Sequence, residues 1–514
     1  MQGLKKADLK IQQLQIKIKH QSQKIRLEKE KNRQLQKSRL GWKTKSMGHL
    51  KSLRAKEKEL RKNKKKKGAR PKNHSYRSDE ISLSLQIRKN GKCSLRSTQS
   101  ILKMLVLILG LELRIPSHES ISLWEKRIGL HSLKRNNYPS DEYAIIIDES
   151  IMIGKEKILL ILGVNLSTYT FERPLTFTEV EVLSIGVSQS WKWSDIVAQI
   201  ESLQSKGLRL KYGISDSGSN ILKALSALGI IRISDCTHAL GKLLEKQYKQ
   251  AADFKAFSQL CGKMRREYTN TNFACFVPPK QRVKGRFLNI IPLSNWAKQM
   301  LKLYEHSKDL TAEERGVLSV LKEYEQLILD LYSQCEVMGK IFEILKSEGI
   351  NEATMKKCEN LVEQSQSTPY FKEGVKKYLQ SNWKEELSKK SLICTSDIIE
   401  SVFGKYKNGI GKNLQNGITD SCLNIPNYGK QLSPQEVLVA LNNTKVIDLK
   451  EWKNKNIKER LLNKKKYVDT LLKQLEQCNV YRRHNKLLFF KYLVLLELID
   501  FKLLTPITIG ELRS

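Results

Sequence analysis

The stretch LRLKYGISDSGSNILKALSALGIIRISDCTH, residues 208–238, decides the fold class of this 514-residue chain. It begins with an apolar run, Leu208 to Ile214, which predicts a strand that leads directly to Asp216. Residues 219–228 have helical spacing, and a second apolar run, residues 229–233, follows them. A strand, a helix and another strand in this order are typical of a parallel βαβ unit.

Three further apolar runs lie upstream and are joined by short links, which is typical of antiparallel strands. They lie at residues 143–147, 157–164 and 180–187, with residues 168–177 as a candidate edge strand and a helix predicted at 193–206. These patterns together predict an α/β fold with a mixed five-stranded sheet.

Two of the predicted strands each deliver a carboxylate. Asp148 follows the first strand and Asp216 follows the fourth. In open α/β sheets, functional sites form at the edge where the parallel strands end. Paired carboxylates can hold Mg²⁺, and two such ions about 4 Å apart can assist both the attacking and the leaving oxygen of a phosphoryl transfer. The alternative for either aspartate alone is that it only begins a turn.

A third carboxylate is expected from another element, and Glu400 is the best candidate. It lies on a predicted helix that Thr395 or Ser396 would cap. Glu400, Gly404 and Lys407 share one stripe of this helix, so Gly404 leaves room beside the carboxylate and Lys407 can meet a phosphate. The alternative is an ordinary surface glutamate on an amphipathic helix.

The net charge of +39, from 92 Lys+Arg against 53 Asp+Glu, indicates a polyanionic partner. Nucleic acid is the first expectation and an anionic membrane surface the second. The most apolar stretch, Ile101 to Leu113, is shorter than the ~20 residues of a membrane span, and we expect no secretory signal. Nine cysteines without a CxxC pair indicate reduced thiols inside a cell.

The N-terminal residues 1–60 predict a basic coiled coil, because apolar residues recur there every seven positions. These residues are Leu4, Ile11, Ile18 and Ile25. A solvated basic helix is the alternative, and residues 61–74 read as a basic linker. Residues 75–140 predict a helix-turn-helix-like DNA-binding domain, with helices at 97–110 and 117–127; a helical linker is the alternative.

The segment Ile214 to Leu244 resembles the second-aspartate region of DDE transposases, in particular the hAT-like group and bacterial insertion-sequence transposases. The matching residues are Asp216, Ser219, Asn220, Lys223 and Ala224, followed by Asp235 and His238. Ser396 to Lys407 resembles the glutamate-bearing helix of insertion-sequence transposases, and Tyr143 to Ser150 is similar to the first-aspartate strand.

The resemblance implies an RNase H-like catalytic core in which Asp148, Asp216 and Glu400 hold two Mg²⁺ ions, with Mn²⁺ as a substitute. It also places His238 beside the active site, where it would position the scissile phosphate or orient a partner residue. The alternative for His238 is a histidine hydrogen-bonded within the core. The implied division of the chain is a core at 141–296, an all-helical insertion at 297–390, a core completion at 391–445 and a helical tail at 446–514.

A basic segment, PPKQRVKGR, precedes the predicted insertion and contains Arg282, Lys284 and Arg286, with Trp296 shortly after it. Basic side chains followed by an aromatic ring suit a distorted or single-stranded DNA end, on which a base can stack. Together with Lys407, these are the predicted DNA-binding residues. For Trp296, burial in the core of the insertion is the alternative.

We therefore predict a DNA transposase that cuts element ends and joins their 3′-hydroxyls to target DNA by two-metal phosphoryl transfer. Its partners would be terminal inverted repeats, target DNA and further copies of itself in a homodimer or larger oligomer, with no membrane. The resemblance implies a bacterial cytoplasmic, nucleoid-associated location. The alternatives are an RNase H-like nuclease without strand transfer, a non-catalytic transposase-derived DNA-binding protein and a basic RNA-binding scaffold.

Overall fold

The chain divides into two compact units, Met1–Arg70 and Pro71–Ser514, in the computed structural model. The structure describes residues 28–29, 32–33, 36, 39–48, 50–54, 68–134, 138, 141–151, 156–281, 287, 290–384, 387, 391–410, 418–457, 465 and 467–473. The described residues between 28 and 54 are helical. Most of the predicted coiled coil, including residues 1–27, lies outside the described residues.

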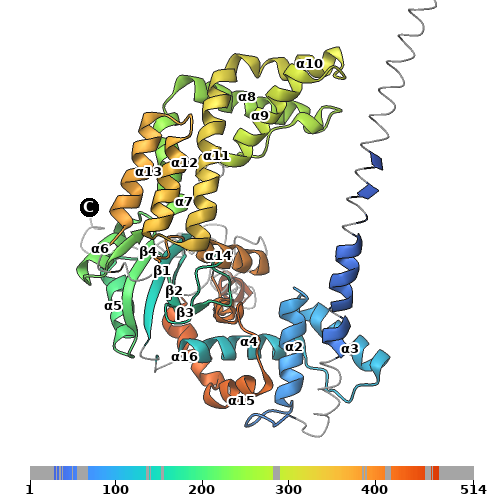
Figure 1. The fold of residues 1–514 in the computed structure, drawn as a ribbon. Coiled ribbons are helices and arrows are strands. Elements are labelled where there is room, and N and C mark those ends of the chain that lie inside the picture. Colours follow the sequence, from blue (N-terminus) through green and yellow to red (C-terminus); the bar gives the residue numbers. More distant parts are fainter. Residues whose placement is uncertain are drawn as a thin grey trace, which may run out of the picture. The chain divides into compact units, whose positions relative to one another are not determined.

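The second unit is built around a five-stranded sheet with the order β3-β2-β1-β4-β5 (Figure 1). The strands are β1 (Glu142–Ile151), β2 (Lys157–Asn165), β3 (Val180–Ser188), β4 (Arg209–Ser215) and β5 (Arg232–Ser234). The β1–β2 and β2–β3 pairs are antiparallel, whereas β1–β4 and β4–β5 are parallel. The predicted mixed five-stranded sheet is confirmed.

The prediction of an edge strand at residues 168–177 is wrong, because these residues form turns and irregular chain. Pro174 lies in the segment, and a proline has no backbone N–H to offer to a strand partner. The aromatic residues that gave the strand-like pattern pack locally instead. The rings of Tyr169 and Phe171 meet edge to face at 4.8 Å, and the Tyr169 hydroxyl donates to the carbonyl of Arg173.

Both faces of the sheet are covered by helices, which explains why β1 reads as a continuous apolar run. On one face, Tyr143 and Ile145 of β1 pack with α5 (Trp193–Gln204) and α6 (Ser219–Ala227). On the other face, Ala144 and Ile146 belong to a large core that includes α7 (Cys236–Tyr248) and α14 (Asp397–Ile410).

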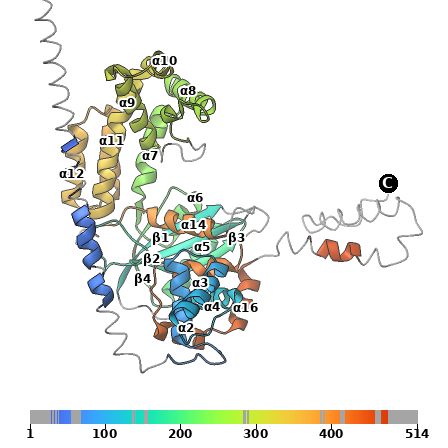
Figure 2. The same ribbon diagram turned by 90° about the vertical axis from the view of Figure 1, so that its right-hand side faces the viewer.

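The described residues between β5 and α14 are mostly helical. The helices are α7, α8 (Ala252–Tyr268), α9 (Ile290–His306), α10 (Ala312–Ser319), α11 (Glu325–Glu348), α12 (Glu352–Glu363) and α13 (Pro369–Asn382), with short 3₁₀ turns at η1 (Ala274–Phe276) and η3 (Lys322–Tyr324). Helix α11 contacts α7, α9 and α12 (Figure 2), and α13 returns to β5. Helices therefore begin directly after the last strand, upstream of residue 297.

A second helical cluster contains α2 (Ser78–Asn90), α3 (Leu95–Leu109) and α4 (His118–Leu133). The Ser117 hydroxyl accepts from the backbone N–H of Ser120 and so caps the start of α4. Helix α4 packs against η5 (Asp420–Asn427), α15 (Pro434–Asn443) and α16 (Val446–Asn456). This helix is therefore largely buried against C-terminal elements.

A glycine fixes the close approach of α4 to η5. A Cβ atom at Gly129 would lie 1.6 Å from the carbonyl oxygen of Leu423. Only glycine therefore fits at this position of α4. Within the described part of the chain, no helix combines the length and the apolar character that a membrane crossing requires.

Candidate active site

Asp148 and Asp216 come next to each other at one edge of the sheet. Ile147 of β1 pairs with Ser215 of the parallel strand β4, and each aspartate is the next residue of its chain. The Asp148 Oδ1 accepts from the backbone N–H of Glu149 at 2.7 Å, and the Asp216 Oδ1 accepts from that of Gly218 at 2.8 Å. The strand register thus brings together two carboxylates that are 68 residues apart in the sequence.

The Asp148 carboxyl is electrostatically strained. Its pKa rises from 3.8 to about 7, chiefly because of burial and also because of the neighbouring charges of Asp216 and Glu400, whereas the Glu149 N–H and His238 oppose the rise. Acids in a cluster disfavour each other's ionised form. The repulsion shows that Asp148 lies close to both of the other predicted catalytic carboxylates, Asp216 and Glu400. A cation between them would relieve the repulsion.

His238 lies in the first turn of α7 and is oriented by Asp235. The buried Asp235 carboxylate accepts from the backbone N–H of Thr237 through Oδ1, at 2.8 Å, and its Oδ2 lies 2.8 Å from His238 Nδ1. This hydrogen bond is the main reason that the pKa of His238 rises to about 9, against the opposing effect of burial. His238 is therefore a cation at neutral pH.

Glu400 approaches this group from α14. The helix begins after Ser396, whose hydroxyl donates to the Asp235 carboxylate, and the Thr395 hydroxyl accepts from the backbone N–H of Asp397. Of the two predicted capping residues, only Thr395 therefore accepts from the helix backbone, because the Ser396 hydroxyl bonds to Asp235 instead. The Glu400 Oε1 lies 3.7 Å from His238 Nε2, and the glutamate side chain is 55% exposed. Partial burial raises the pKa of Glu400, and His238 lowers it.

Gly404 and Lys407 continue the stripe that begins at Glu400. A Cβ atom at Gly404 would meet no atom within 4 Å, so the surface beside this stripe is open, as predicted. Lys407 is exposed. The arrangement leaves access to Glu400 from solvent.

Two positively charged residues at the site carried no sequence signal. Arg232 of β5 donates to the carbonyl of Asp216 at 2.8 Å and to that of Ser215 at 3.3 Å, which fixes the end of β4. Lys346 of α11 forms an ion pair with Asp397 at 2.5 Å. Lys346 thereby joins the helical segment to the helix that carries Glu400.

The donor set suits a hard cation, because it consists of carboxylate oxygens on adjacent strands and a nearby helix. Among the described residues, no three His, Cys, Asp or Glu side chains converge closely enough to enclose a metal ion. Mg²⁺ tolerates such an incomplete protein shell, since it commonly retains water and takes further oxygens from substrate phosphates. The residues present therefore fit Mg²⁺ better than a metal that needs a closed cage.

The predicted DNA-binding residues have different outcomes. Arg282, Lys284 and Arg286 lie outside the described residues. Trp296 is only 9% exposed and belongs to the core around α9, so its ring offers no open face for a base. The alternative for Trp296, burial in the core of the helical segment, is therefore confirmed.

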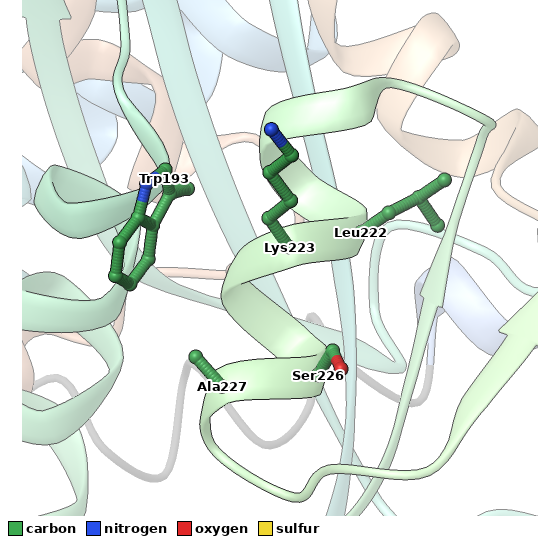
Figure 3. Close-up of a pocket in the computed structure, with 5 residues that line it drawn as sticks. All are labelled: Trp193, Leu222, Lys223, Ser226 and Ala227. Carbon is green, nitrogen blue, oxygen red and sulfur yellow. The ribbon is translucent and has the colours of Figure 1, made fainter.

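A different tryptophan lines an open hollow of about 590 Å³ between α5 and α6 (Figure 3). Trp193 comes from the start of α5 and is 45% exposed, while Lys223 and Ser226 come from α6. The ring of Trp193 and the side chain of Lys223 both border the open space. None of the predicted catalytic carboxylates lines this hollow.

The sequence matches no protein-family model and no curated protein. Among solved structures, the chain is similar to the Drosophila P element transposase strand transfer complex, with 13% sequence identity and a TM-score of 0.37. The similarity covers 76% of this chain and 97% of that chain.

Proposed function

We propose that this protein is a DNA transposase, which cuts DNA at the ends of an element and joins the freed 3′-hydroxyls to target DNA. One observation carries the proposal: Asp148 and Asp216 follow paired positions of two parallel strands, and Asp148 is close enough to His238 and Glu400 for their charges to act on its carboxyl. Such a carboxylate cluster in a protein of net charge +39 suits chemistry on a phosphodiester.

The sheet supports an RNase H-like core. Three antiparallel strands are followed by two parallel strands that alternate with helices, which is the mixed five-stranded arrangement that the resemblance of the sequence implies. The glutamate-bearing helix α14 contacts β1 although some 250 residues separate the two elements. The helical segment between β5 and α14 accounts for that separation.

Asp148, Asp216 and Glu400 would hold Mg²⁺ in this proposal. When bound, the ions supply Lewis-acid activation of the attacking oxygen and stabilise charge on the leaving oxygen. The protein alone stabilises the Asp148 carboxylate anion poorly, so a bound cation would favour its ionised form. Arg232 holds the backbone that positions Asp216.

His238 would act on the phosphate through its Nε2 proton. The Asp235 carboxylate occupies Nδ1, fixes the ring and keeps the imidazole protonated at neutral pH. The Nε2 atom faces Glu400, so a phosphate bound beside Glu400 would come within reach of its proton. That proton can hold a non-bridging phosphate oxygen or pass to the leaving oxygen.

A joining assay tests the proposal. The protein would be incubated with Mg²⁺, pre-cut duplexes made from the DNA that flanks its coding region, and a plasmid target. We expect the 3′-ends to become linked to the plasmid, and the Asp148→Asn variant to lose this activity. Glu201→Gln, which changes an exposed carboxylate on α5, is the matched control and should join normally. Cleavage without joining would instead identify a nuclease, and DNA binding without either reaction a non-catalytic protein.

A further inference from the structure

Three lysines from distant parts of the sequence form a positively charged cluster near the start of the α2–α3 connection. Lys89 lies in the last turn of α2, Lys92 follows that helix, and Lys405 lies on α14. Among the described residues, no carboxylate forms an ion pair with Lys89 or Lys405, although other lysines of the chain have such partners. The cluster therefore keeps its positive charge.

Lys405 is held in place without being neutralised. Its Nζ lies 5.0 Å from the ring centre of Phe177 and 4.6 Å from that of Tyr428. Aromatic faces attract an ammonium group through their quadrupole but carry no net charge. The lysine is thus oriented by two rings, and its charge stays available to an anion.

Lys89 is likewise oriented by a neutral group. Its Nζ donates to the backbone carbonyl of Lys430, and the side chain is half-buried. Burial and repulsion from Lys405 lower the pKa of Lys89, and burial and repulsion from Lys92 lower that of Lys405. Lys430 and Tyr428 are two residues apart, so one short segment of chain holds both the Lys89 and the Lys405 ammonium groups. Lys405 thus lies near both Lys89 and Lys92, and an anion bound beside it would relieve the repulsion.

Lys92 adds an independent observation, because its backbone is in the left-handed region with φ of 50°. The N–H of Lys92 bonds the carbonyl of Lys89 and that of Cys93 bonds the carbonyl of Arg88, so Lys92 occupies the helix-ending position that normally favours glycine. A long side chain at such a position is unfavourable. A strained residue that persists indicates a role for its side chain.

We propose that Lys89, Lys92 and Lys405 form a binding site for the phosphates of a DNA backbone. The inference rests on the proposed function and deepens it, because it assigns DNA contact to residues outside the carboxylate cluster. Lys405 and Glu400 belong to the same helix. DNA bound by the three lysines would therefore be held in a fixed position relative to Glu400, one of the proposed metal ligands.

The salt dependence of DNA binding tests this site. The dissociation constant for a short random-sequence DNA duplex would be measured over a range of salt concentrations, for the full chain and for Lys89→Met, Lys92→Gly and Lys405→Met. Each variant should bind more weakly, and the slope of log affinity against log salt should fall by about one per lysine. Lys340→Gln removes a lysine that is already paired with Glu336 on α11 and should leave the slope unchanged.

Lys92→Gly separates binding from folding. Glycine suits the left-handed backbone, so this variant should melt at or above the temperature of the unaltered protein and yet bind DNA more weakly. Lys405→Arg, which keeps the charge between the two rings, should retain both the affinity and the slope. If affinity and slope are unchanged in Lys92→Gly and Lys405→Met, the lysine site is wrong.

This failure is distinct from failure of the proposed function. A protein that binds DNA and joins ends, but is indifferent to all three lysine substitutions, would overturn only the lysine site. A protein that binds no DNA at all would overturn both.

Discussion

The Oδ2 atom of Asp235 lies 2.8 Å from Nδ1 of His238, and this contact organises the candidate active site. Asp235 is fully buried and also accepts from Thr237 and Ser396, so it fixes the start of α7 and touches the start of α14. It therefore orients His238 toward Glu400 and sets the charge of the imidazole.

The Asp235–His238 pair should control the alkaline limit of DNA cleavage. Because His238 has a pKa of about 9, cleavage that needs its proton should persist through neutral pH and fall as the pH rises through about 9. Asp235→Asn removes the main cause of that raised pKa, so the fall should move toward the ordinary value of 6.5. His238→Gln should reduce cleavage by about 10²–10⁴-fold at neutral pH, and the difference should shrink above about pH 9, where the unaltered protein also loses the proton. A pH–rate profile that is identical in Asp235→Asn and the unaltered protein would contradict this role.

The raised pKa of Asp148 predicts a stability effect that Mg²⁺ should reverse. Between 3.8 and about 7, the folded protein keeps a proton on Asp148 that the unfolded chain has released. This stabilising contribution is complete below pH 3.8 and is lost as the pH rises through about 7. Its loss costs at most roughly 4 kcal/mol of unfolding free energy.

Thermal melting measured from about pH 5 to about pH 8 checks this effect. Without metal, Asp148→Asn should lose less stability than the unaltered protein over that range. Mg²⁺ should raise the melting temperature of the unaltered protein more at the higher pH, and should have little effect on the variant. Equal responses of the two proteins to Mg²⁺ would argue against Asp148 as a ligand.

The ion pair between Lys346 and Asp397 should couple the helical segment to the Glu400 helix. Lys346→Met and Asp397→Asn, tested singly and together, should show a coupling of about 0.5–1 kcal/mol in unfolding free energy, because both side chains are partly solvent-screened. Lys346→Met should also reduce cleavage while DNA binding is retained. Strictly additive unfolding energies would indicate that the pair contributes nothing.

Gly129→Ala should destabilise the contact between α4 and η5. The new Cβ would overlap the carbonyl of Leu423, and overpacking of this kind costs roughly 1–3 kcal/mol or more. Gly316→Ala is the matched control, since a Cβ there meets no atom within 4 Å and alanine favours the helix α10. Urea denaturation of both variants measures the difference; equal midpoints would show that α4 does not pack as described.

The sheet could be predicted from the sequence because its signals are local. Each strand is a short apolar run that is bounded by turn residues. Ser117 and Ser433 mark the starts of α4 and α15, because their side chains accept hydrogen bonds from the first turns of these helices. The 168–177 prediction failed because aromatic residues that pack locally look like an alternating strand. Asp148 and Asp216 could be placed together because strand direction fixes which edge they reach.

The remaining parts of the site depend on contacts between segments far apart in the sequence. Arg232 donates to the backbone carbonyl of Asp216, and Lys346 forms an ion pair with Asp397. The spacing of residues in the sequence predicts neither contact. The burial of Trp296 and the packing of α4 against C-terminal helices also follow from tertiary contacts. The lysine cluster joins positions 92 and 405, so only the folded chain reveals it.

We propose that Asp148, Asp216 and Glu400 form one metal-dependent centre for cutting DNA. Its most direct test is Mg²⁺-dependent cleavage of DNA that carries an element end, measured beside DNA affinity for Asp216→Asn. We predict that cleavage falls below detection in this variant while affinity for the same DNA is retained. Cleavage at an undiminished rate by Asp216→Asn would contradict the claim.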